Sequence, residues 1–155
     1  MDNPLYWQFY RKLSQEPQEL VILDNSAYEG RMNMDLAFDR LNGLRTDALV
    51  LPDFVGQRSE LTFRAGIAFI KQWRHQLPFD LMYVPQFDGT IEDYQVMKKH
   101  VRSMVEDFGI AWFGLPRLTA ERGYSRSELC LYIKRLKANW DHDPIYVHAL
   151  GMCNG

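Results

Sequence analysis

The sequence predicts an α/β fold in which five parallel strands alternate with helices. Five short apolar runs recur along the chain, and their carboxyl ends follow one another every 29 to 35 residues, which is the length of one strand–helix unit. Amphipathic stretches with recognisable helix starts lie between these runs. Because right-handed connections between such units make the strands parallel, two architectures fit: an open doubly wound sheet, or about five strands of a (β/α)8 barrel.

The five apolar runs are nearly continuous and rich in branched residues, which is typical of strands buried on both faces. They span residues 19–25, 47–53, 80–86, 110–116 and 144–151. In both architectures the functional site lies at the carboxyl ends of the strands. The residues that end each run are therefore the first candidates for a site.

Capping residues predict where the helices begin. Thr90 can cap a helix with an apolar face, and Gly109 follows as its stop. Ser125 and Glu128 have capping-box spacing ahead of another apolar stretch. Further helices are expected to start near Pro4, Asn33 and Ser59. The first of them, with proline in its first turn, would bury Phe9.

The composition describes an ordinary globular protein. The chain has 155 residues, of which 46% are hydrophobic and 25% charged, and this excludes disordered, collagen-like and coiled-coil proteins. A formal net charge of -2 gives no overall attraction to nucleic acid or membrane. The two cysteines suit a reducing compartment, and no apolar run approaches the roughly 20 residues of a membrane span. We therefore expect a cytoplasmic protein, away from membranes, with one domain over residues 1–155.

Polar side chains gather at the predicted strand ends. Asp24 and Asn25 end the first run, Asp53 ends the second and Gln86 ends the third. No phosphate-binding glycine motif follows any strand, which argues against a nucleoside triphosphate or dinucleotide site. A rim of carboxylates and amides suits a planar polar ligand with several hydrogen-bond donors.

Five segments at these strand ends resemble one known family. ILDNSAYEG, LPDF, VPQ, GLP and YVHALG occur in this order, one strand–helix unit apart. Together they resemble the TIM-barrel core of the tRNA-guanine transglycosylases, and more closely the shorter phage-type relatives that insert 7-deazaguanines into DNA. Each segment alone is a weak motif, but five in order are fairly specific, and the resemblance extends from Leu20 to the end. It implies a partial TIM barrel.

The resemblance also implies a function, the exchange of guanine for a 7-deazaguanine in tRNA or DNA. In the family an aspartate attacks C1′ of the sugar, the base leaves, and the incoming base displaces the enzyme. By motif, Asp24 matches an aspartate in acid/base chemistry, Asp53 the aspartate that accepts hydrogen bonds from the base, and Gln86 the glutamine at its exocyclic oxygen. Gly114 and Leu115 match residues whose backbone contacts the base. The expected base-binding residues are Asn25, Asp53, Gln86, Gly114 and Leu115.

The expected roles agree with the chemistry of guanine. Its adjacent N1–H and N2–H donors suit a carboxylate that accepts both, and a pocket built on such pairs rejects analogues that lack them. Tyr28, Phe54 and Phe87 are candidate stacking surfaces for a base. Arg117 and Arg122, in a stretch with six basic and two acidic residues over 117–137, are candidate contacts to a nucleic-acid backbone.

Parts of the family's pattern have no counterpart in this sequence. The nucleophilic aspartate follows the strand that resembles residues 144–151, the zinc module of the tRNA enzymes comes later, and a first barrel strand precedes the opening helix. We therefore expect a domain without the first and last barrel strands, which forms a homo-oligomer or is completed by a partner chain. Two alternatives stay open: a catalytically inactive module that binds guanine or a deazaguanine, or binds another protein, and an unrelated strand–helix protein.

Neither a metal nor a cofactor is expected. The four histidines have no partners at metal-ligand spacing. His148 falls inside a predicted strand and could point into the barrel, but a hydrogen-bonded histidine of the core is its expected role.

Overall fold

The computed structural model describes residues 8–9, 11–12, 15–24, 45–137 and 144–150. Within these residues the chain forms a sheet of five parallel strands, each inside one of the predicted apolar runs. The strands are β1 (Ile22–Leu23), β2 (Ala48–Val50), β3 (Asp80–Tyr83), β4 (Trp112–Leu115) and β5 (Tyr146–Ala149).

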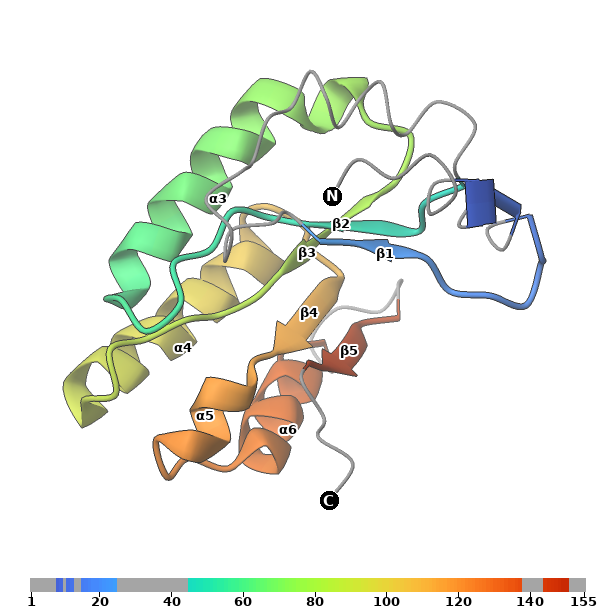
Figure 1. Cartoon of the computed structure of the whole chain (residues 1–155). Helices are drawn as coiled ribbons and strands as arrows, with labels where there is room; N and C mark the ends of the chain where they lie inside the picture. Colours follow the sequence, from blue (N-terminus) through green and yellow to red (C-terminus); the bar gives the residue numbers. More distant parts are fainter. Residues whose placement is uncertain (1–7, 10, 13–14, 25–44, 138–143, 151–155) are drawn as a thin grey trace.

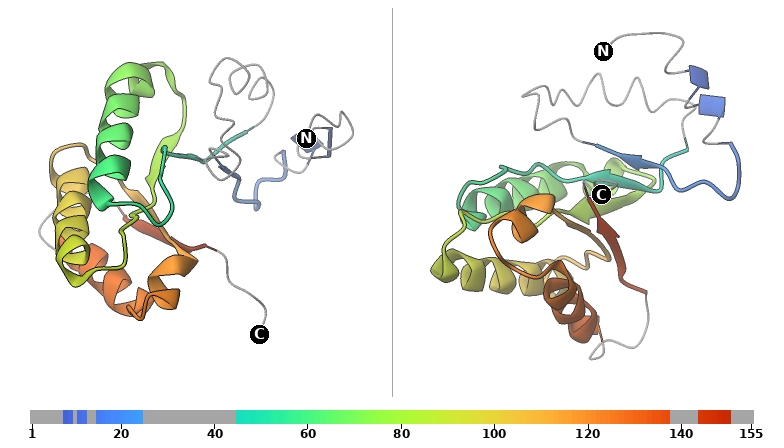
Figure 2. Two further views of the ribbon diagram at one scale, coloured as in Figure 1. Left: turned by 60° about the vertical axis from the view of Figure 1, so that its left-hand side comes forward. Right: turned by 60° about the horizontal axis from the view of Figure 1, so that its bottom comes forward.

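The strand order decides between the two predicted architectures. The strands lie side by side in sequence order, β1-β2-β3-β4-β5, without the reversal that defines a doubly wound sheet. The sheet curls, and the helices cover its outer face (Figures 1 and 2). The described residues therefore form a partial barrel, as predicted.

Most of the described helices begin where the sequence places them. They are α3 (Ser59–Trp73), the 3-10 turn η2 (Arg74–Gln76), α4 (Ile91–Glu106), α5 (Arg117–Glu121) and α6 (Arg126–Lys137). Thr90 Oγ1 accepts a hydrogen bond from the backbone N–H of Asp93 at 3.2 Å, and Ser125 Oγ accepts one from Glu128 at 3.2 Å. Gly109 follows α4 with a φ of 61°, a conformation that glycine adopts without strain. These three predictions are confirmed.

The amino-terminal segments are less well predicted. The helix expected near Asn33 lies outside the described residues, and so does most of the one expected near Pro4. Phe9 is described and is 60% exposed, so the prediction that it is buried is wrong. The short blue segment near the start of the chain lies beyond the amino-terminal ends of β1 and β2 and not against the face of the sheet (Figure 1).

The start of α3 is stabilised in a way that the sequence did not indicate. Ser59 is the first residue of α3, as predicted, but its N–H and hydroxyl both donate to the carboxylate of Asp93, at 2.9 and 2.6 Å. Asp93 belongs to the first turn of α4, and it also accepts the N–H of Asp88 at 2.9 Å. One buried carboxylate thus joins the starts of two helices and the loop after β3.

The core lies mainly on the helix side of the sheet. Leu49, Tyr83 and Phe113 point from the strands into a large cluster that α3, α4 and α6 cover. A smaller cluster with Val50 and Met82 occupies the opposite face. Strands β2 and β4 are buried on both faces as predicted, whereas β1 and β5, which have one described neighbour each, are only half buried or exposed.

Candidate functional site

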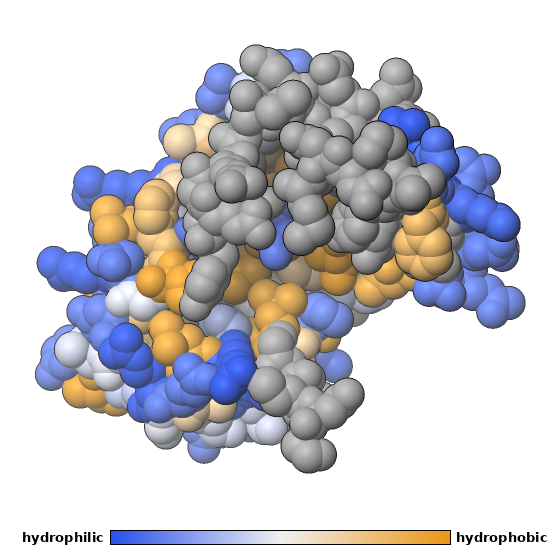
Figure 3. Space-filling view, viewed as in Figure 1, coloured by the Kyte–Doolittle hydropathy of each residue, from blue (hydrophilic) through white to orange (hydrophobic). Residues whose placement is uncertain are grey.

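A cavity of about 680 Å³ lies at the carboxyl ends of the strands, on the face opposite the large helices. Residues from each of the five strand ends border it, together with the loop after β2 and helix α5. Hydrophobic side chains gather in the middle of this side of the molecule, with charged ones around them (Figure 3). The lining residues are Ile22, Asp24, Val50, Asp53, Val55, Val84, Gln86, Pro116, Arg117, Leu118, Glu121, His148 and Leu150. The cavity is thus an apolar surface with a few polar groups, as in most small-molecule sites.

Asp53 and Gln86 form the best-defined polar pair of this cavity. Asp53 follows β2, Gln86 follows β3, and Gln86 Nε2 donates to Asp53 Oδ2 at 2.7 Å. The side chain of Gln86 is buried, so this pair is shielded from much of the solvent. The structure therefore brings together two of the residues that the sequence predicted for one ligand.

Contacts on the helix side of the sheet hold the two loops that carry Asp53 and Gln86. The backbone N–H of Phe54 donates to Thr62 Oγ1 on α3 at 3.0 Å, which holds the chain just after Asp53. Phe87, next to Gln86, is buried against the rings of Tyr94 and Tyr124, with ring centroids 5.2 and 5.1 Å away. Phe87 is therefore a support for the loop and not a stacking surface, which corrects the expectation for this residue.

Of the other predicted catalytic and base-binding residues, only Asp24 lines the cavity in the described part of the chain. Asp24, at the end of β1, is exposed and lines the cavity, whereas Asn25 lies outside the described residues. Gly114 and Leu115 are buried on β4, and neither lines the cavity. A side chain at position 114 would meet Leu150 and Val84 at 2.8 Å, so these two residues cover that part of the strand. The carbonyl of Leu115 accepts the N–H of Leu150 at 2.9 Å.

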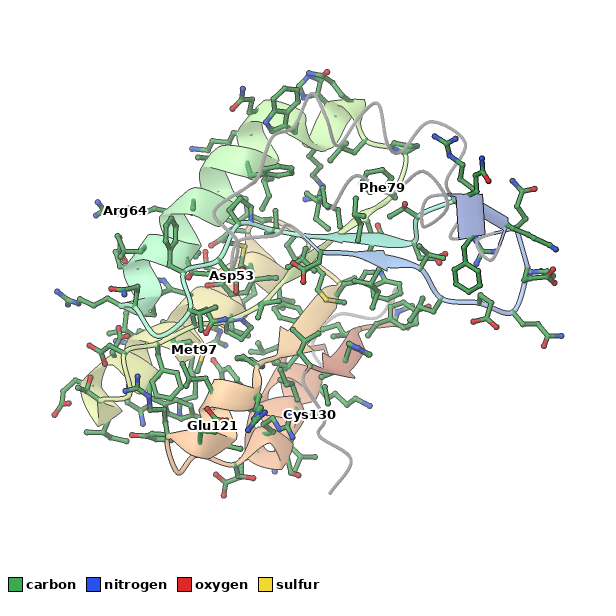
Figure 4. All side chains as sticks on the ribbon, in the orientation of Figure 1. Asp53, Arg64, Phe79, Met97, Glu121 and Cys130 are labelled. Carbon is green, nitrogen blue, oxygen red and sulfur yellow. The ribbon has the colours of Figure 1, made fainter. Side chains whose placement is uncertain are left out.

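The two predicted nucleic-acid contacts lie at the rim. Arg117 borders the cavity and pairs with Glu121, Nε to Oε1 at 2.5 Å, within α5. Arg122 lies one residue beyond α5, and its Nη1 donates to the carbonyl of Asp88 at 2.7 Å, so it ties the start of the α5–α6 loop to the loop after β3. Phe54, a candidate stacking surface, is 45% exposed but does not line the cavity, although its neighbours Asp53 and Val55 do. Tyr28, another such candidate, lies outside the described residues. Figure 4 shows Asp53 and Phe79 at opposite ends of the strands.

The carboxylate of Asp53 influences the pKa of the buried Tyr83 hydroxyl on β3. Burial raises the pKa of Tyr83 above its usual range, and the carboxylates of Asp53, Glu60 and Asp93 raise it further. Its hydroxyl therefore stays protonated. At the rim, two hydrogen bonds from Thr90 lower the pKa of Asp88, so this carboxylate stays charged.

Two polar residues of the cavity, Glu121 and His148, were not among the predicted site residues. His148 is exposed and lines the cavity, so its expected role as a core histidine is wrong. Its neighbours Val147 and Ala149 are half buried, and Val147 packs against the helix-side core. The strand alternation of residues 146–149 could have placed His148 on the cavity side.

Chemically, the cavity combines carboxylates, an amide, an imidazole and a guanidinium around an apolar surface. Among the described residues, no group of three or more histidine, cysteine or acidic side chains suits a metal ion, and no helix is long and apolar enough to cross a membrane. Comparison with known protein families, with curated proteins and with solved structures finds no match to this chain.

Proposed function

We propose that the cavity binds a guanine-type base and that the chain exchanges guanine for a 7-deazaguanine in a nucleic acid, or is the base-binding part of such an enzyme. The single observation that supports this best is the Asp53–Gln86 pair at 2.7 Å on the wall of a cavity large enough for a base. The resemblance of the strand-end segments to the transglycosylases supports the same ligand.

The pair matches the hydrogen-bonding edge of guanine. A carboxylate can accept the N1–H and N2–H groups of the base together. The amide of Gln86 has two N–H groups, so one can stay on Asp53 while the other donates to the exocyclic oxygen O6. Adenine presents an acceptor where guanine presents N1–H, so it would leave the Asp53 carboxylate facing a lone pair.

The rest of the cavity suits the flat faces of the base. Val50, Val84 and Leu150 supply an apolar surface on the sheet, and Leu118 lies on α5. Burial of the ring faces adds affinity, while the polar pair adds selectivity, because its groups would be unpaired with the wrong base.

For exchange, the chain needs a group that acts at the sugar. Asp24 is the candidate, as an acid/base or as the attacking carboxylate, because it lines the same cavity from β1. Arg117 and Arg122 would contact phosphates of DNA or tRNA at the rim. A second copy or a partner chain would complete the barrel beside the strands β1 and β5.

Calorimetry tests base binding. The chain is expected to bind guanine and 7-cyano-7-deazaguanine and not adenine. Asp53→Asn should weaken guanine binding about a hundredfold, because a charged acceptor of two hydrogen bonds is lost. Asp107→Asn, at the end of α4 and away from the cavity, is the matched control and should bind as the wild type does. Equal affinity of Asp53→Asn for guanine would refute the assignment of this site.

Release of labelled guanine from DNA or tRNA separates an enzyme from a binding module. If the chain is an enzyme, Asp24→Asn keeps guanine affinity and loses exchange. Base binding by the wild type without exchange on either nucleic acid would favour the inactive module.

A further inference from the structure

We propose that His148 faces position 7 of the bound base and selects bases that carry a hydrogen-bond acceptor there. This inference rests on the proposed function and adds to it the residue that discriminates among guanine-type bases.

The position of His148 follows from the register of the sheet. It lies on β5 directly beside Gly114 of β4, on the exposed side that borders the cavity. Arg126 Nη1 donates to the carbonyl of Leu150 at 3.0 Å, which fixes the chain two residues beyond His148. The imidazole therefore belongs to an anchored strand end and not to a free loop.

The order of polar groups around the cavity matches their order around a purine. Asp53 follows β2 and Gln86 follows β3, and β4 contributes Gly114, which has no side chain. Among the strands and the residues directly after them, His148 on β5 is therefore the next polar side chain beyond Gln86, whereas the polar residues Arg117 and Glu121 reach the cavity from α5. Around guanine, N2 and N1 are followed by O6 and then by N7. A base with N1 and N2 on Asp53 and O6 on Gln86 thus turns its position 7 toward β5.

The spacing allows this contact. Strands β3 and β5 are separated by two strand intervals, about 10 Å, which two side chains and the edge of a base between them can span. Leu150 and Val84 cover the backbone of Gly114 in that interval and offer an apolar surface for the ring.

Because imidazole carries a ring N–H donor, His148 should favour bases that have a hydrogen-bond acceptor at position 7. A ring N–H can donate to N7 of guanine or to the nitrogen of a 7-cyano group. 7-Deazaguanine has a C–H at this position and accepts nothing, and an aminomethyl group there is a cationic donor. 7-Deazaguanine therefore leaves the imidazole N–H without a partner, which costs affinity, whereas an aminomethyl group has to use the unprotonated ring nitrogen as its acceptor.

Calorimetry with guanine and 7-deazaguanine tests the inference, since the two bases differ only at position 7. The wild type is expected to bind guanine about tenfold more tightly, the effect of one hydrogen bond. In His148→Ala the two affinities should become equal, and His148→Gln, which keeps an N–H donor, should restore part of the preference. His75→Ala is the matched control: His75 is exposed on η2, away from the cavity, and its loss should leave the preference unchanged.

The outcomes separate this inference from the function it rests on. Equal binding of the two bases by the wild type, or an unchanged preference in His148→Ala, would overturn the role of His148 while guanine binding through Asp53 stands. Absence of guanine binding by the folded wild type would overturn both. Should His148→Ala fail to fold in a thermal melt, the wild-type comparison and His148→Gln still decide.

Discussion

The two faces of the sheet each carry an aspartate that accepts hydrogen bonds, but one carboxylate stabilises the fold and the other borders a cavity. On the helix side, the Asp93 carboxylate is buried and accepts three hydrogen bonds, from two groups of Ser59 and from the N–H of Asp88. On the other side, Asp53 is half buried beside an open cavity and receives the amide of Gln86. Two neighbours on β4 show the same division, since Phe113 fills the helix-side core and Gly114 contributes no side chain. Stability therefore resides mainly on one face, and the other is available for a ligand.

Truncation of one aromatic residue on each face should give the largest difference in the free energy of unfolding. Phe113→Ala should lower the free energy of unfolding by about 3–5 kcal/mol, because Phe113 is fully buried in the large cluster. Tyr146→Ala, on the cavity-side face of β5, should cost less than about 1 kcal/mol, because Tyr146 is 47% exposed and mainly stacks on Trp112. Chemical denaturation measures both. Equal losses would mean that the two faces stabilise the fold alike.

The two carboxylates provide the next test. Asp93→Ala should cost about 2–4 kcal/mol, because two buried donors of Ser59 and the part-buried N–H of Asp88 lose their acceptor. Asp53→Ala should cost less, about 1–2 kcal/mol, since the amide of the buried Gln86 loses this acceptor but the adjacent cavity gives solvent partial access to it. Denaturant titration of both variants checks the difference, and a larger loss for Asp53→Ala would contradict the division between the faces.

A smaller effect on stability is expected at Gly89, in the loop after β3, which packs against the side chain of Arg122. Gly89 has a φ of 96°, and a Cβ there would lie 2.1 Å from Arg122 Nη1. Gly89→Ala should therefore cost about 1 kcal/mol more than Gly123→Ala, which has a φ of 82° and open space around the added carbon. In an Arg122→Ala background the two glycine variants should cost the same. A difference that persists there would show that Arg122 is not its cause.

The smallest expected effect is the pH dependence of stability that comes from His100, a residue of α4 that packs against α3. Its ring stacks on Phe63 with centroids 4.0 Å apart, and burial lowers its pKa although Glu60 and Asp93 oppose the shift. The folded protein therefore takes up this proton at a lower pH than the unfolded chain, whose histidine pKa is about 6.5. The stability of the wild type should be full above that pH and fall as the pH drops through the folded pKa.

His100→Gln checks this assignment. The stability difference between the wild type and this variant should shift against the wild type as the pH falls from about 7.5 to 5.5. Parallel profiles in denaturant titrations at several pH values would show that His100 makes no such contribution.

The sequence predicted the scaffold better than the site. Short branched runs and the caps at Thr90 and Ser125 are local signals, and each of them is confirmed. Asp93 could not be identified in this way, because its partner Ser59 is 34 residues away and the contact depends on how two helices pack. For His148 the sequence left open an orientation into the barrel, and the core role that it favoured is wrong because β5, at the edge of the described sheet, exposes residues that a central strand would bury.

Backbone NMR with guanine tests the central claim most directly, since it reports on both faces of the sheet at once. Addition of guanine should shift the amides around Asp53, Gln86 and His148 at the carboxyl ends of the strands. The amides of Ser59 and Asp93 on the helix side, and of Asp80 at the opposite strand ends, should stay in place. Shifts confined to the helix side or to the amino ends of the strands, or no shifts at a saturating concentration, would contradict a base site in this cavity.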